Sequence, residues 1–534
     1  MADDLNPSQY RELRIQRINQ LQSLNESSVY PHKFHVSIEI GAFCESYKGV
    51  KTDEIDTNVV ESVAGRIVFK RKSSNKLYFY QIIGGVSTVQ ILANFKYYKG
   101  SQEDFLDIND NTIRRGDIIG IKGHPSRSKT GELSIVPLEI ILLSPCVRML
   151  PHPGTLNDVE IRHRNRHLDG IVNRNNLYNT ISGRHKIISF IRRFFDDRGF
   201  IHVETPTMSL LPGGATARPF VTYHNDLDMN MFMRISPELD LKKCVVAGFD
   251  KVYEIGRNYR NESADLTHNP EFTAIEVYEA YADYEDMMVM TETLLSSLTL
   301  YLFGKCQVPY KKANGDEVVI DFTPPFKRYP MMETLEEKMG VKFPENLESS
   351  DAESKIKKIL DDKNIKCSPP YTVARMIDKL VGEYIEPLLG NPAFITEHPQ
   401  LMCPLAKYHR SKKGLTERFE LFVLGKELCN AYTELNNPFV QKDLFEKQQT
   451  DRDAGDDEVM PIDMGFVEAL EHGLPPTGGW GMGIDRLVMF LTNNTSIREV
   501  ILFPANRPTD EERKAQMQLK RVLDGSLKRA DGTH

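Results

Sequence analysis

The stretch 254–281 constrains the fold most, because it places charged and aromatic residues in sequences that alternate like β-strands. It reads "EIGRNYRNESADLTHNPEFTAIEVYEAY". Strand side chains alternate between two faces, so a strand over 271–282 would show Glu276 and Tyr278 on one face. A sheet that only had to fold would turn such polar groups to water. We therefore expect a polar sheet face that is directed either to solvent or to a cleft.

The first half of this stretch has the same character. A strand over 252–262 would place Arg260 and Glu262 on one face. The connection "NESADLTHNP" is long for a hairpin and carries His268, so it could fold over a ligand. Taken alone, an arginine and a glutamate at this spacing could equally be a surface ion pair, and the aromatic residues could be ordinary core residues.

A second run, "FELFVLGKELCNAYTELNNP", gathers carboxylates. Asn430, Tyr432 and Glu434 would share a strand face, and Glu420 and Glu427 precede them. Carboxylates at this density raise one another's pKa unless a cation lies among them. The candidate cations are a divalent metal, which prefers oxygen ligands, or an ammonium group.

A third run, "GLPPTGGWGMGIDRLVMFL", is rich in glycine. Four glycines between 478 and 483 would let the backbone approach a ligand closely, and Arg486 falls in the first turn of a helix expected at 484–491. Neither a Walker A loop nor a Rossmann fingerprint is present, and a glycine-rich turn can also be purely structural. Together the three runs predict a nucleotide site with a cationic neighbour.

Short strand-like runs separated by turn residues fill residues 61–147, and five of them predict a small OB-type barrel. This segment has 12 Lys+Arg and 8 Asp+Glu, a net +4, within a chain of formal net charge −8. The run "FKRKSSNKLYFY" interleaves cations with aromatic residues, the composition of single-strand nucleic-acid binders. Barrels that bind nothing also have such strands.

The chain of 534 residues is too long for one core, so several domains are expected. An amphipathic helix over 8–24 would dock through Tyr10, Leu13, Ile18 and Leu21, with Arg11, Arg14 and Arg17 on a solvated face. The expected parts are 1–60, helix and lead-in; 61–147, barrel; 148–186, polar linker; 187–508, alternating helices and strands with a helical insertion at about 331–400; and 509–534, tail.

Cysteine usage predicts the compartment. The chain has 7 scattered cysteines and no CxxC pair, a pattern typical of reduced thiols in the cytosol. The N-terminal residues lack the apolar run of a signal peptide, and nothing approaches the ~20 apolar residues of a membrane span. We therefore expect a cytoplasmic protein with no membrane contact.

Three ordered motifs resemble those of the class II aminoacyl-tRNA synthetases. "FIHVETPTMSLLPGGATARPF", with Pro206, resembles motif 1; "YRNESADLTHNPEF" resembles motif 2; "GGWGMGIDRLVMF" resembles motif 3. The wording of "PGGATARPF" and "CNAYTELNNP" is similar to lysyl-tRNA synthetases of the eukaryotic cytosolic kind, and the likeness covers about 7–508. The resemblance implies an α+β protein: an N-terminal OB barrel for the anticodon, and an antiparallel catalytic sheet flanked by helices that forms a homodimer through motif 1.

The resemblance also implies an activity, the ATP-dependent ligation of L-lysine to tRNA(Lys) through a lysyl-adenylate, with Mg²⁺. Arg260 would bind the α-phosphate and the lysine carboxylate, Glu262 the adenine amino group, and Phe272 the adenine ring. Arg486 would hold the γ-phosphate. The other implied ATP contacts are His268 and Asn269 near the β- and γ-phosphates, and Leu428, Gly483 and Glu427.

For lysine, the matching positions imply that Glu238 takes the α-amino group and Asn430 lies near the carboxylate. Glu434 and Tyr278 would read the ε-ammonium. The remaining implied contacts are Gly214 and Glu276 for lysine, Glu420 and Glu427 for Mg²⁺, and Arg71, Phe79, Gln90 and Glu132 for the anticodon. Glu427 precedes Glu434 by seven residues, which puts them on opposite faces of a regular strand, so a metal role for Glu427 requires a bulge or an irregular start of the strand.

Two alternatives stay open on the sequence. An aspartyl or asparaginyl synthetase of the same subclass would need a cation in its amino-acid pocket, whereas Glu238, Glu276 and Glu434 would repel an acidic substrate. A synthetase-like RNA-binding or regulatory protein would be expected to lose a motif arginine, and both Arg260 and Arg486 are present.

Overall fold

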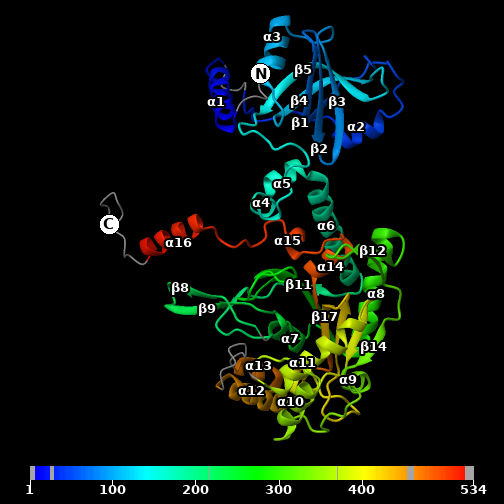
Figure 1. The fold of residues 1–534 in the computed structure, drawn as a ribbon, viewed down its shortest axis with the longest axis vertical. Helices are drawn as coiled ribbons and strands as arrows, with labels where there is room; N and C mark the ends of the chain where they lie inside the picture. The colour runs from blue at the N-terminus through cyan, green and yellow to red at the C-terminus, as the bar shows by residue number, and fades with distance from the viewer. Residues whose placement is uncertain (1–5, 25–28, 216, 370, 454–461, 524–534) are drawn as a thin grey trace. The chain divides into compact units, whose positions relative to one another are not determined.

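The computed structural model describes residues 6–24, 29–215, 217–369, 371–453 and 462–523. The chain divides into two compact units, Met1–Tyr178 and Asn179–His534 (Figure 1). Within the described ranges, no helix combines the length and the apolar composition needed to cross a bilayer.

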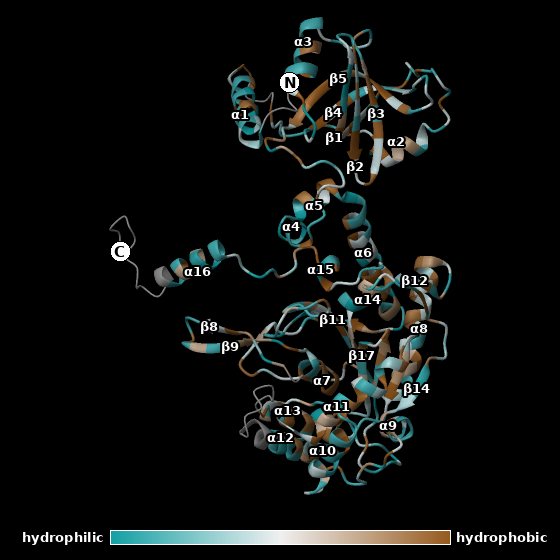
Figure 2. Cartoon of the chain, in the orientation of Figure 1, coloured by the Kyte–Doolittle hydropathy of each residue, from teal (hydrophilic) through white to brown (hydrophobic). Residues whose placement is uncertain are grey.

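The first unit is built on a closed five-stranded barrel, which confirms the expected OB-type fold. Its strands follow the order β1-β2-β3-β5-β4. They are β1 (Glu61–Ser74), β2 (Leu77–Gly84), β3 (Ser87–Asn94), β4 (Ile118–Arg127) and β5 (Leu133–Ser144). Inward residues such as Tyr78, Tyr80 and Ile82 on β2 are buried at alternate positions, and hydrophobic residues run along β2 and β5 (Figure 2). The five strands expected within 61–147 are therefore all present.

Helices close and flank the barrel. Those between β3 and β4 are α3 (Gln102–Leu106) and the single π-helical turn η2 (Asp107–Thr112). The lead-in carries α1 (Pro7–Leu24) and α2 (Ile40–Ser46), and the expected linker holds α4 (Val159–Arg164), α5 (Arg166–Val172) and the start of α6 (Arg174–Asp196).

Helix α1 docks on the barrel through Tyr10, Ile18 and Leu21 as expected, but Leu13 and Arg14 depart from the expectation. Arg14 is buried, and its Nη2 lies 2.8 Å from both carboxylate oxygens of Asp117. Its Nη1 donates to the carbonyl oxygen of Thr112 at 2.7 Å. Leu13 is 51 % exposed. The prediction that Arg14 lies on a solvated face is therefore wrong, because a bidentate partner inside the barrel satisfies its charge.

The second unit contains an eight-stranded sheet in the order β14-β15-β16-β17-β18-β11-β10-β6. The central strands are antiparallel and the outermost pairs, β14–β15 and β10–β6, are parallel. The strands are β6 (Ile201–His202), β10 (Lys251–Tyr259), β11 (Glu271–Ala280), β14 (Lys327–Pro330), β15 (Ala393–Thr396), β16 (Arg418–Val423), β17 (Lys426–Thr433) and β18 (Thr477–Gly483). The expected sheet flanked by helices is confirmed.

One face of this sheet forms the main core. Trp480 and Met482 of β18 point into it and are buried. Helices α6, α8 (Tyr284–Phe303) and α14 (Ile484–Leu491) contribute residues such as Ile187, Leu295 and Leu487 to the same cluster. The opposite face is therefore the one available for a site.

Smaller elements surround the sheet. The predicted helical insertion contains α9 (Met331–Met339), α10 (Ala352–Asp362) and α11 (Val373–Tyr384), followed by the 3₁₀ turn η3 (Glu386–Leu388), around a separate apolar cluster. Strand β15 lies within the same range and belongs to the large sheet. The others are β7 (Met208–Ser209), β8 (Val221–His224), β9 (Met229–Met233), β12 (Gln307–Lys311), β13 (Glu317–Asp321), η4 (Gln400–Met402), α7 (Glu238–Val246), α12 (Pro438–Asp453), α13 (Met464–Glu471), α15 (Ile497–Val500) and α16 (Asp510–Leu523).

Candidate active site

Strand pairing brings residues of three distant runs into two neighbouring rows that cross the sheet. Glu276 of β11 is paired with Gly481 of β18, which is paired with Asn430 of β17. Two positions along, Tyr278 is paired with Gly479, which is paired with Tyr432. Residues two apart share a face, so both rows face the same side of the sheet, away from the main core.

The middle strand of this face is bare backbone. Gly479, Gly481 and Gly483 occupy three successive outward positions of β18 and alternate with the core residues Trp480 and Met482. A Cβ on Gly479 would lie 1.8 Å from Oε1 of Glu434 and 2.8 Å from the Tyr278 ring, so any side chain there would displace both groups. A Cβ on Gly481 or Gly483 would have its nearest protein neighbour at 3.6 or 4.0 Å. The protein does not fill the space above those two glycines, which suits a ligand.

A cavity of about 210 Å³ opens above these glycines. Of the residues assigned to lysine, ATP or metal from the sequence, every one lines it except Glu420. Those lining residues are Gly214, Glu238, Arg260, Glu262, His268, Asn269, Phe272, Glu276, Tyr278, Glu427, Leu428, Asn430, Glu434, Gly483 and Arg486.

One end of the cavity is acidic. Oε1 of Glu276 accepts a hydrogen bond from Ser236 Oγ at 2.8 Å, and Oε2 accepts one from the Tyr278 hydroxyl at 3.3 Å. Burial, with Glu238 adding, raises the pKa of Glu276 to about 7. Burial also raises the pKa of Tyr278 well above its ordinary value, so its hydroxyl stays a donor at neutral pH.

The sequence analysis missed a lysine behind this acidic end. Lys242 Nζ lies 2.7 Å from Oε1 of Glu238 and 2.5 Å from Oε2 of Glu434, and its side chain has no exposed area. Glu238 Oε1 also accepts a hydrogen bond from the Tyr432 hydroxyl at 2.6 Å. The available signal was the four-residue spacing of Glu238 and Lys242, which pairs residues along a helix.

Arg418 is a second residue that the sequence analysis missed. Its Nε donates to Oδ1 of Asn430 at 3.0 Å, and its Nη2 donates to Oε1 of Glu420 at 2.6 Å. Since the Asn430 carbonyl oxygen is engaged, its amide nitrogen is left to donate toward the cavity. Glu420 is drawn away from the cavity, with Oε2 3.4 Å from Nε2 of His398.

The other end of the cavity is cationic and aromatic. Strand β10 ends at Tyr259, so Arg260 and Glu262 lie in the following loop and the predicted strand to residue 262 is wrong. The Arg260 backbone N–H still donates to the carbonyl oxygen of Pro270 at 2.9 Å. The Arg260 guanidinium carbon lies 5.2 Å from the ring centre of Phe272, a cation–π contact.

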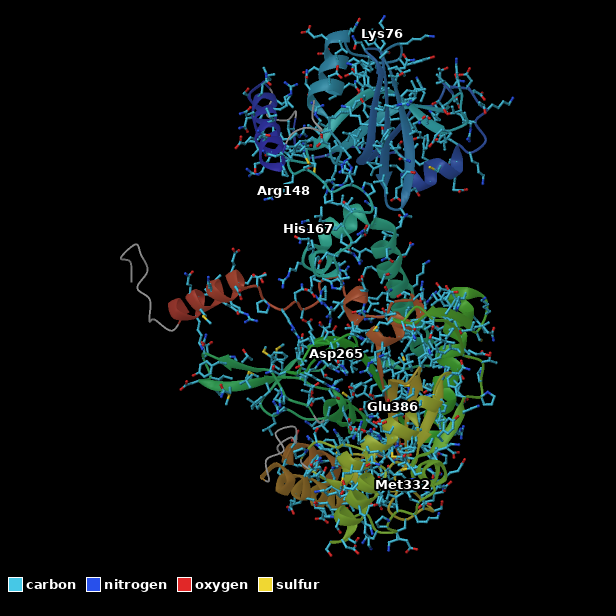
Figure 3. The ribbon with its side chains drawn as sticks, in the orientation of Figure 1. Lys76, Arg148, His167, Asp265, Met332 and Glu386 are labelled. Carbon is cyan, nitrogen blue, oxygen red and sulfur yellow. The ribbon has the colours of Figure 1, made fainter. Side chains whose placement is uncertain are left out.

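Arg486 ties this loop to the end of the sheet. Its Nη1 donates to the Glu427 carbonyl oxygen at 2.6 Å, and its Nη2 lies 3.0 Å from Nε2 of His268. His268 Nδ1 lies 2.9 Å from Oδ2 of Asp265, which Figure 3 labels. An arginine can only donate hydrogen bonds, so Nε2 of His268 accepts one from Arg486. The proton of the ring is then on Nδ1, which donates to Asp265. The Asn269 side chain fixes the backbone of this loop, because its amide nitrogen donates to the Glu271 carbonyl oxygen at 2.6 Å.

A bulge in β17 meets the requirement set by the spacing of Glu427 and Glu434. Leu421 is paired with Cys429 and Phe422 with Glu427, so Leu428 is one extra residue. A bulge re-aims the side chains before it, and both glutamates line the cavity. Burial, with Glu420 adding, raises the pKa of Glu427.

Comparison with known proteins bears on this geometry. Residues 158–507 match the family of tRNA synthetases class II (D, K and N), and residues 61–143 match the OB-fold nucleic acid binding domain. The chain belongs to the class II tRNA synthetases. It is 46 % identical to "Lysine--tRNA ligase cla4" of Cladosporium cladosporioides, over 98 % of this chain and 89 % of that protein.

Other relatives of the synthetase carry similar names. It is 46 % identical to "Probable lysine--tRNA ligase, cytoplasmic" of Encephalitozoon cuniculi, over 90 % of this chain and 94 % of that one. It is 41 % identical to "Lysine--tRNA ligase" of Thermotoga maritima, over 95 % and 99 %. The match therefore extends over both units of the chain.

The barrel of the synthetase carries its own hollow, of about 290 Å³. All four residues that the sequence assigned to the anticodon, Arg71, Phe79, Gln90 and Glu132, line it. The guanidinium carbon of Arg71 lies 5.1 Å from the ring centre of Phe79, and Oε1 of Gln90 accepts from Ser134 at 2.9 Å. Phe69, 53 % exposed, lies at the same hollow.

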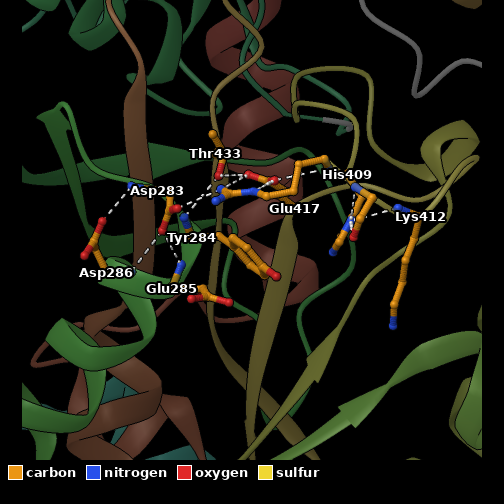
Figure 4. A network of polar contacts seen from close by, with 10 residues as sticks. Asp283, Tyr284, Glu285, Asp286, His409, Lys412, Glu417 and Thr433 are labelled. Atoms are coloured by element: carbon orange, nitrogen blue, oxygen red, sulfur yellow. Dashed lines mark hydrogen bonds and ion pairs between the residues drawn. The ribbon is translucent and has the colours of Figure 1, made fainter.

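A polar network behind the acidic end supports the synthetase cavity (Figure 4). Arg410 pairs with Glu417 and, at 2.7 Å, with Asp283, which caps α8. Glu417 Oε2 accepts from Thr433 Oγ1 at 2.7 Å, and that hydroxyl accepts from the Tyr284 N–H at 3.0 Å. The network fixes the backbone at Thr433, next to Glu434.

Proposed function

We propose that the protein joins L-lysine to tRNA(Lys), using ATP and a lysyl-adenylate intermediate. The observation that carries the proposal is one cavity with two unlike ends. Glu238, Glu276 and Glu434 line one end, and Arg260 and Arg486 line the other. This arrangement suits a diamino acid beside a triphosphate, because each charge meets its opposite.

The acidic end supports a role for each residue in binding lysine. Glu238 binds the α-amino group, while Glu434 and the Tyr278 hydroxyl read the ε-ammonium. Asn430 donates its free amide hydrogens to the carboxylate end, because Arg418 already occupies its oxygen. Glu276 serves either ammonium, and Gly214, with φ of +82°, lets the chain approach the ligand.

The cationic end supports the ATP contacts. Phe272 stacks on the adenine, Glu262 accepts from its amino group, and Arg260 binds the α-phosphate. Arg486 holds the γ-phosphate with His268 beside it, since the two side chains are already in contact. The backbone at Leu428 and Gly483 borders the nucleotide, and Asn269 shapes the loop that covers the β- and γ-phosphates.

The reaction is an in-line attack of the lysine carboxylate on the α-phosphorus, which releases pyrophosphate. The terminal ribose hydroxyl of tRNA then takes the lysyl group and releases AMP. Neither step needs a covalent nucleophile on the protein, so catalysis consists of positioning and of charge stabilisation. Arg260 contacts both reacting groups and neutralises the charge that develops between them.

Glu420 and Glu427 are the proposed Mg²⁺ ligands, and Glu420, whose Oε1 is held by Arg418, would offer its Oε2. The two carboxylates are close enough for Glu420 to raise the pKa of Glu427, a repulsion that a divalent cation would relieve. Carboxylate oxygen is the ligand that Mg²⁺ prefers. When bound, Mg²⁺ would neutralise phosphate charge at the cationic end.

The barrel hollow is the proposed anticodon site. Phe79, with Arg71 against its ring, offers a stacking surface, and Gln90 and Glu132 offer groups for hydrogen bonds to base edges. We further propose that the protein works in the cytoplasm as a homodimer. Apolar residues around motif 1 support the dimer, because several are exposed: Met208, Leu210, Leu211, Val221, Tyr223 and Met229.

The test measures ATP–pyrophosphate exchange with each of the twenty amino acids, followed by charging of total tRNA. Lysine alone should drive exchange. Aspartate or asparagine would need a cation exposed in the acidic end, and Lys242, the cation nearest to it, is already paired with two carboxylates. Exchange driven by an acidic or amide amino acid, or by none, would overturn the proposal.

A further inference from the structure

Lys242 differs from the other charged residues at the acidic end because it does not line the cavity. It lies one helical turn after Glu238 on α7, and its side chain is completely buried. An ammonium in such a place is costly unless its partners are close and charged. Its partners are Glu238 at 2.7 Å and Glu434 at 2.5 Å.

The surroundings of Lys242 come from three elements. Glu238 lies on the same helix as Lys242, α7. The Tyr432 ring, 5.8 Å from Nζ, lies on β17, and Glu434 follows that strand directly. The Phe466 ring of α13 lies 5.5 Å away. Although burial acts the other way, Glu238 and Glu434 hold the pKa of Lys242 above its ordinary value, so it remains an ammonium at neutral pH. Burial raises the pKa of Glu434 well above its ordinary value, and Lys242 is the neighbour that acts against this rise.

Lys242 engages only one oxygen of Glu434. It contacts Oε2, whereas Oε1 lies against the bare backbone of Gly479. Within the described part of the chain, both oxygens of Glu434 and Nζ of Lys242 are buried and make no regular hydrogen bond, so the contact between Nζ and Oε2 is an ion pair. Oε2 therefore has a charged partner behind it, whereas Oε1 has no such partner among the described residues.

The balance of charges indicates what Lys242 does at the acidic end. Glu238, Glu276 and Glu434 carry three negative charges when ionised, and Lys242 carries one positive charge. The acidic end then has a net charge of about −2, which matches the two ammonium groups of a diamino acid. Without Lys242, three buried carboxylates would face one another and at least one would take up a proton.

We propose that Lys242 is a specificity-determining positioning residue, a built-in ammonium that keeps Glu434 ionised and oriented for the ε-ammonium of lysine. The proposal rests on the proposed function, since it concerns how the same cavity selects its amino acid. Lys242 acts through Glu434 and Glu238 and does not touch the substrate.

The test is the pH dependence of the KM for lysine in ATP–pyrophosphate exchange, measured between about pH 6.5 and pH 9 for the wild type, Lys242→Met and Lys242→Arg. In Lys242→Met, Glu434 should be protonated near neutral pH. The KM for lysine should then rise about ten-fold at neutral pH, corresponding to one unit of pKa, and should recover toward the wild-type value at the alkaline end. Lys242→Arg, which keeps the charge, should keep the wild-type pH profile even if its KM changes.

The matched control is Lys243→Met, at the next residue. Lys243 is 38 % exposed and pairs with Asp240 at 3.2 Å, outside the cavity. It should leave the profile unchanged. In all variants the KM for ATP and the thermal unfolding curve report whether the fold survives.

Two results would overturn the role of Lys242. One is a KM for lysine in Lys242→Met that equals the wild-type value, and the other is a KM raised by the same factor at every pH, which indicates a packing role only. Should Lys242→Met fail to fold, a Lys242→Arg variant with an altered pH profile would have the same consequence. Absence of lysine-dependent exchange in the wild type would instead overturn the proposed function.

Discussion

At the scale of single residues, the site contains a carboxyl group that is poorly solvated in the ligand-free protein. Glu276 has a pKa of about 7 in the fold, because of burial and of the neighbouring Glu238, against about 4.3 for an exposed glutamate. The folded state therefore binds more protons than the unfolded state between these two values. Stability is lost as the pH rises through this window, by about 4 kcal/mol in total.

Glu276→Gln should therefore stabilise the ligand-free protein at about pH 8 and have little effect at about pH 5. The same change should raise the KM for lysine, because it removes a negative charge from the acidic end. Thermal unfolding at the two pH values checks the first effect, and exchange kinetics check the second. Glu279→Gln is the control: Glu279 pairs with Lys251 at 2.7 Å, so its loss should give no gain at pH 8. An equal gain in both variants would contradict the argument.

The glycines of β18 allow a second residue-scale prediction. Gly479→Ala would place a methyl group 1.8 Å from Oε1 of Glu434 and 2.8 Å from the Tyr278 ring. It should lower kcat/KM for lysine-dependent exchange by about a hundred-fold or more, because Glu434 and Tyr278, which bind the ε-ammonium, must both move. Gly483→Ala, whose new methyl meets nothing closer than 4.0 Å, should fold normally and mainly raise the KM for ATP. Similar effects of both changes on lysine and ATP would argue against the assigned ends.

At the scale of elements, alternation and turn residues predicted most of the strands. The five barrel strands lie within 61–147 as expected, and β11, β16, β17 and α14 fall where the sequence indicated, as does β10 apart from its end. The register across three strands was not predictable, because the pairing of β11 and β17 with β18 joins segments that are far apart in the chain. The bulge at Leu428 was expected only because Glu427 had been assigned to a metal.

Buried charged residues were the ones that sequence reasoning missed or misplaced. Lys242, Arg418 and Arg14 all have charged side chains, and composition alone favours a solvated position for such residues. Lys242 and Arg14 each meet a carboxylate from a distant segment, Glu434 and Asp117 respectively, and Arg418 meets Asn430 of the neighbouring strand as well as Glu420 of its own. Partners from other segments are a property of the tertiary fold, so a single sequence does not reveal them.

The barrel supports an element-scale prediction. Phe79→Ala removes the ring that faces Arg71 in the hollow. Charging of tRNA should fall by one to two orders of magnitude, as expected for the loss of one stacked base, while lysine-dependent exchange should stay at the wild-type level. Tyr97→Ala, which removes an aromatic residue outside the hollow, serves as the control. A parallel loss of exchange would show that the barrel is more than a separate anticodon reader.

At the scale of the whole molecule, the exposed apolar residues around motif 1 bear on assembly. Val221 on β8 is 58 % exposed, as is expected of a residue that a second copy covers. Val221→Asp should shift the molar mass in solution from that of a dimer to that of a monomer, measured by light scattering after gel filtration. Val319→Asp is a matched control, because Val319 is 59 % exposed on β13. A wild-type protein that is already monomeric would contradict the dimer.

The glycine face of β18 also limits how such a cavity can change its preference. A floor of peptide groups presents the same surface to any amino acid, and Gly479 cannot acquire a side chain without displacing Glu434. New selectivity must therefore arise on the adjoining strands and on α7. Relatives that activate acidic or amide substrates are therefore expected to keep the glycines of β18 and to differ in the side chains of the adjoining strands and of α7.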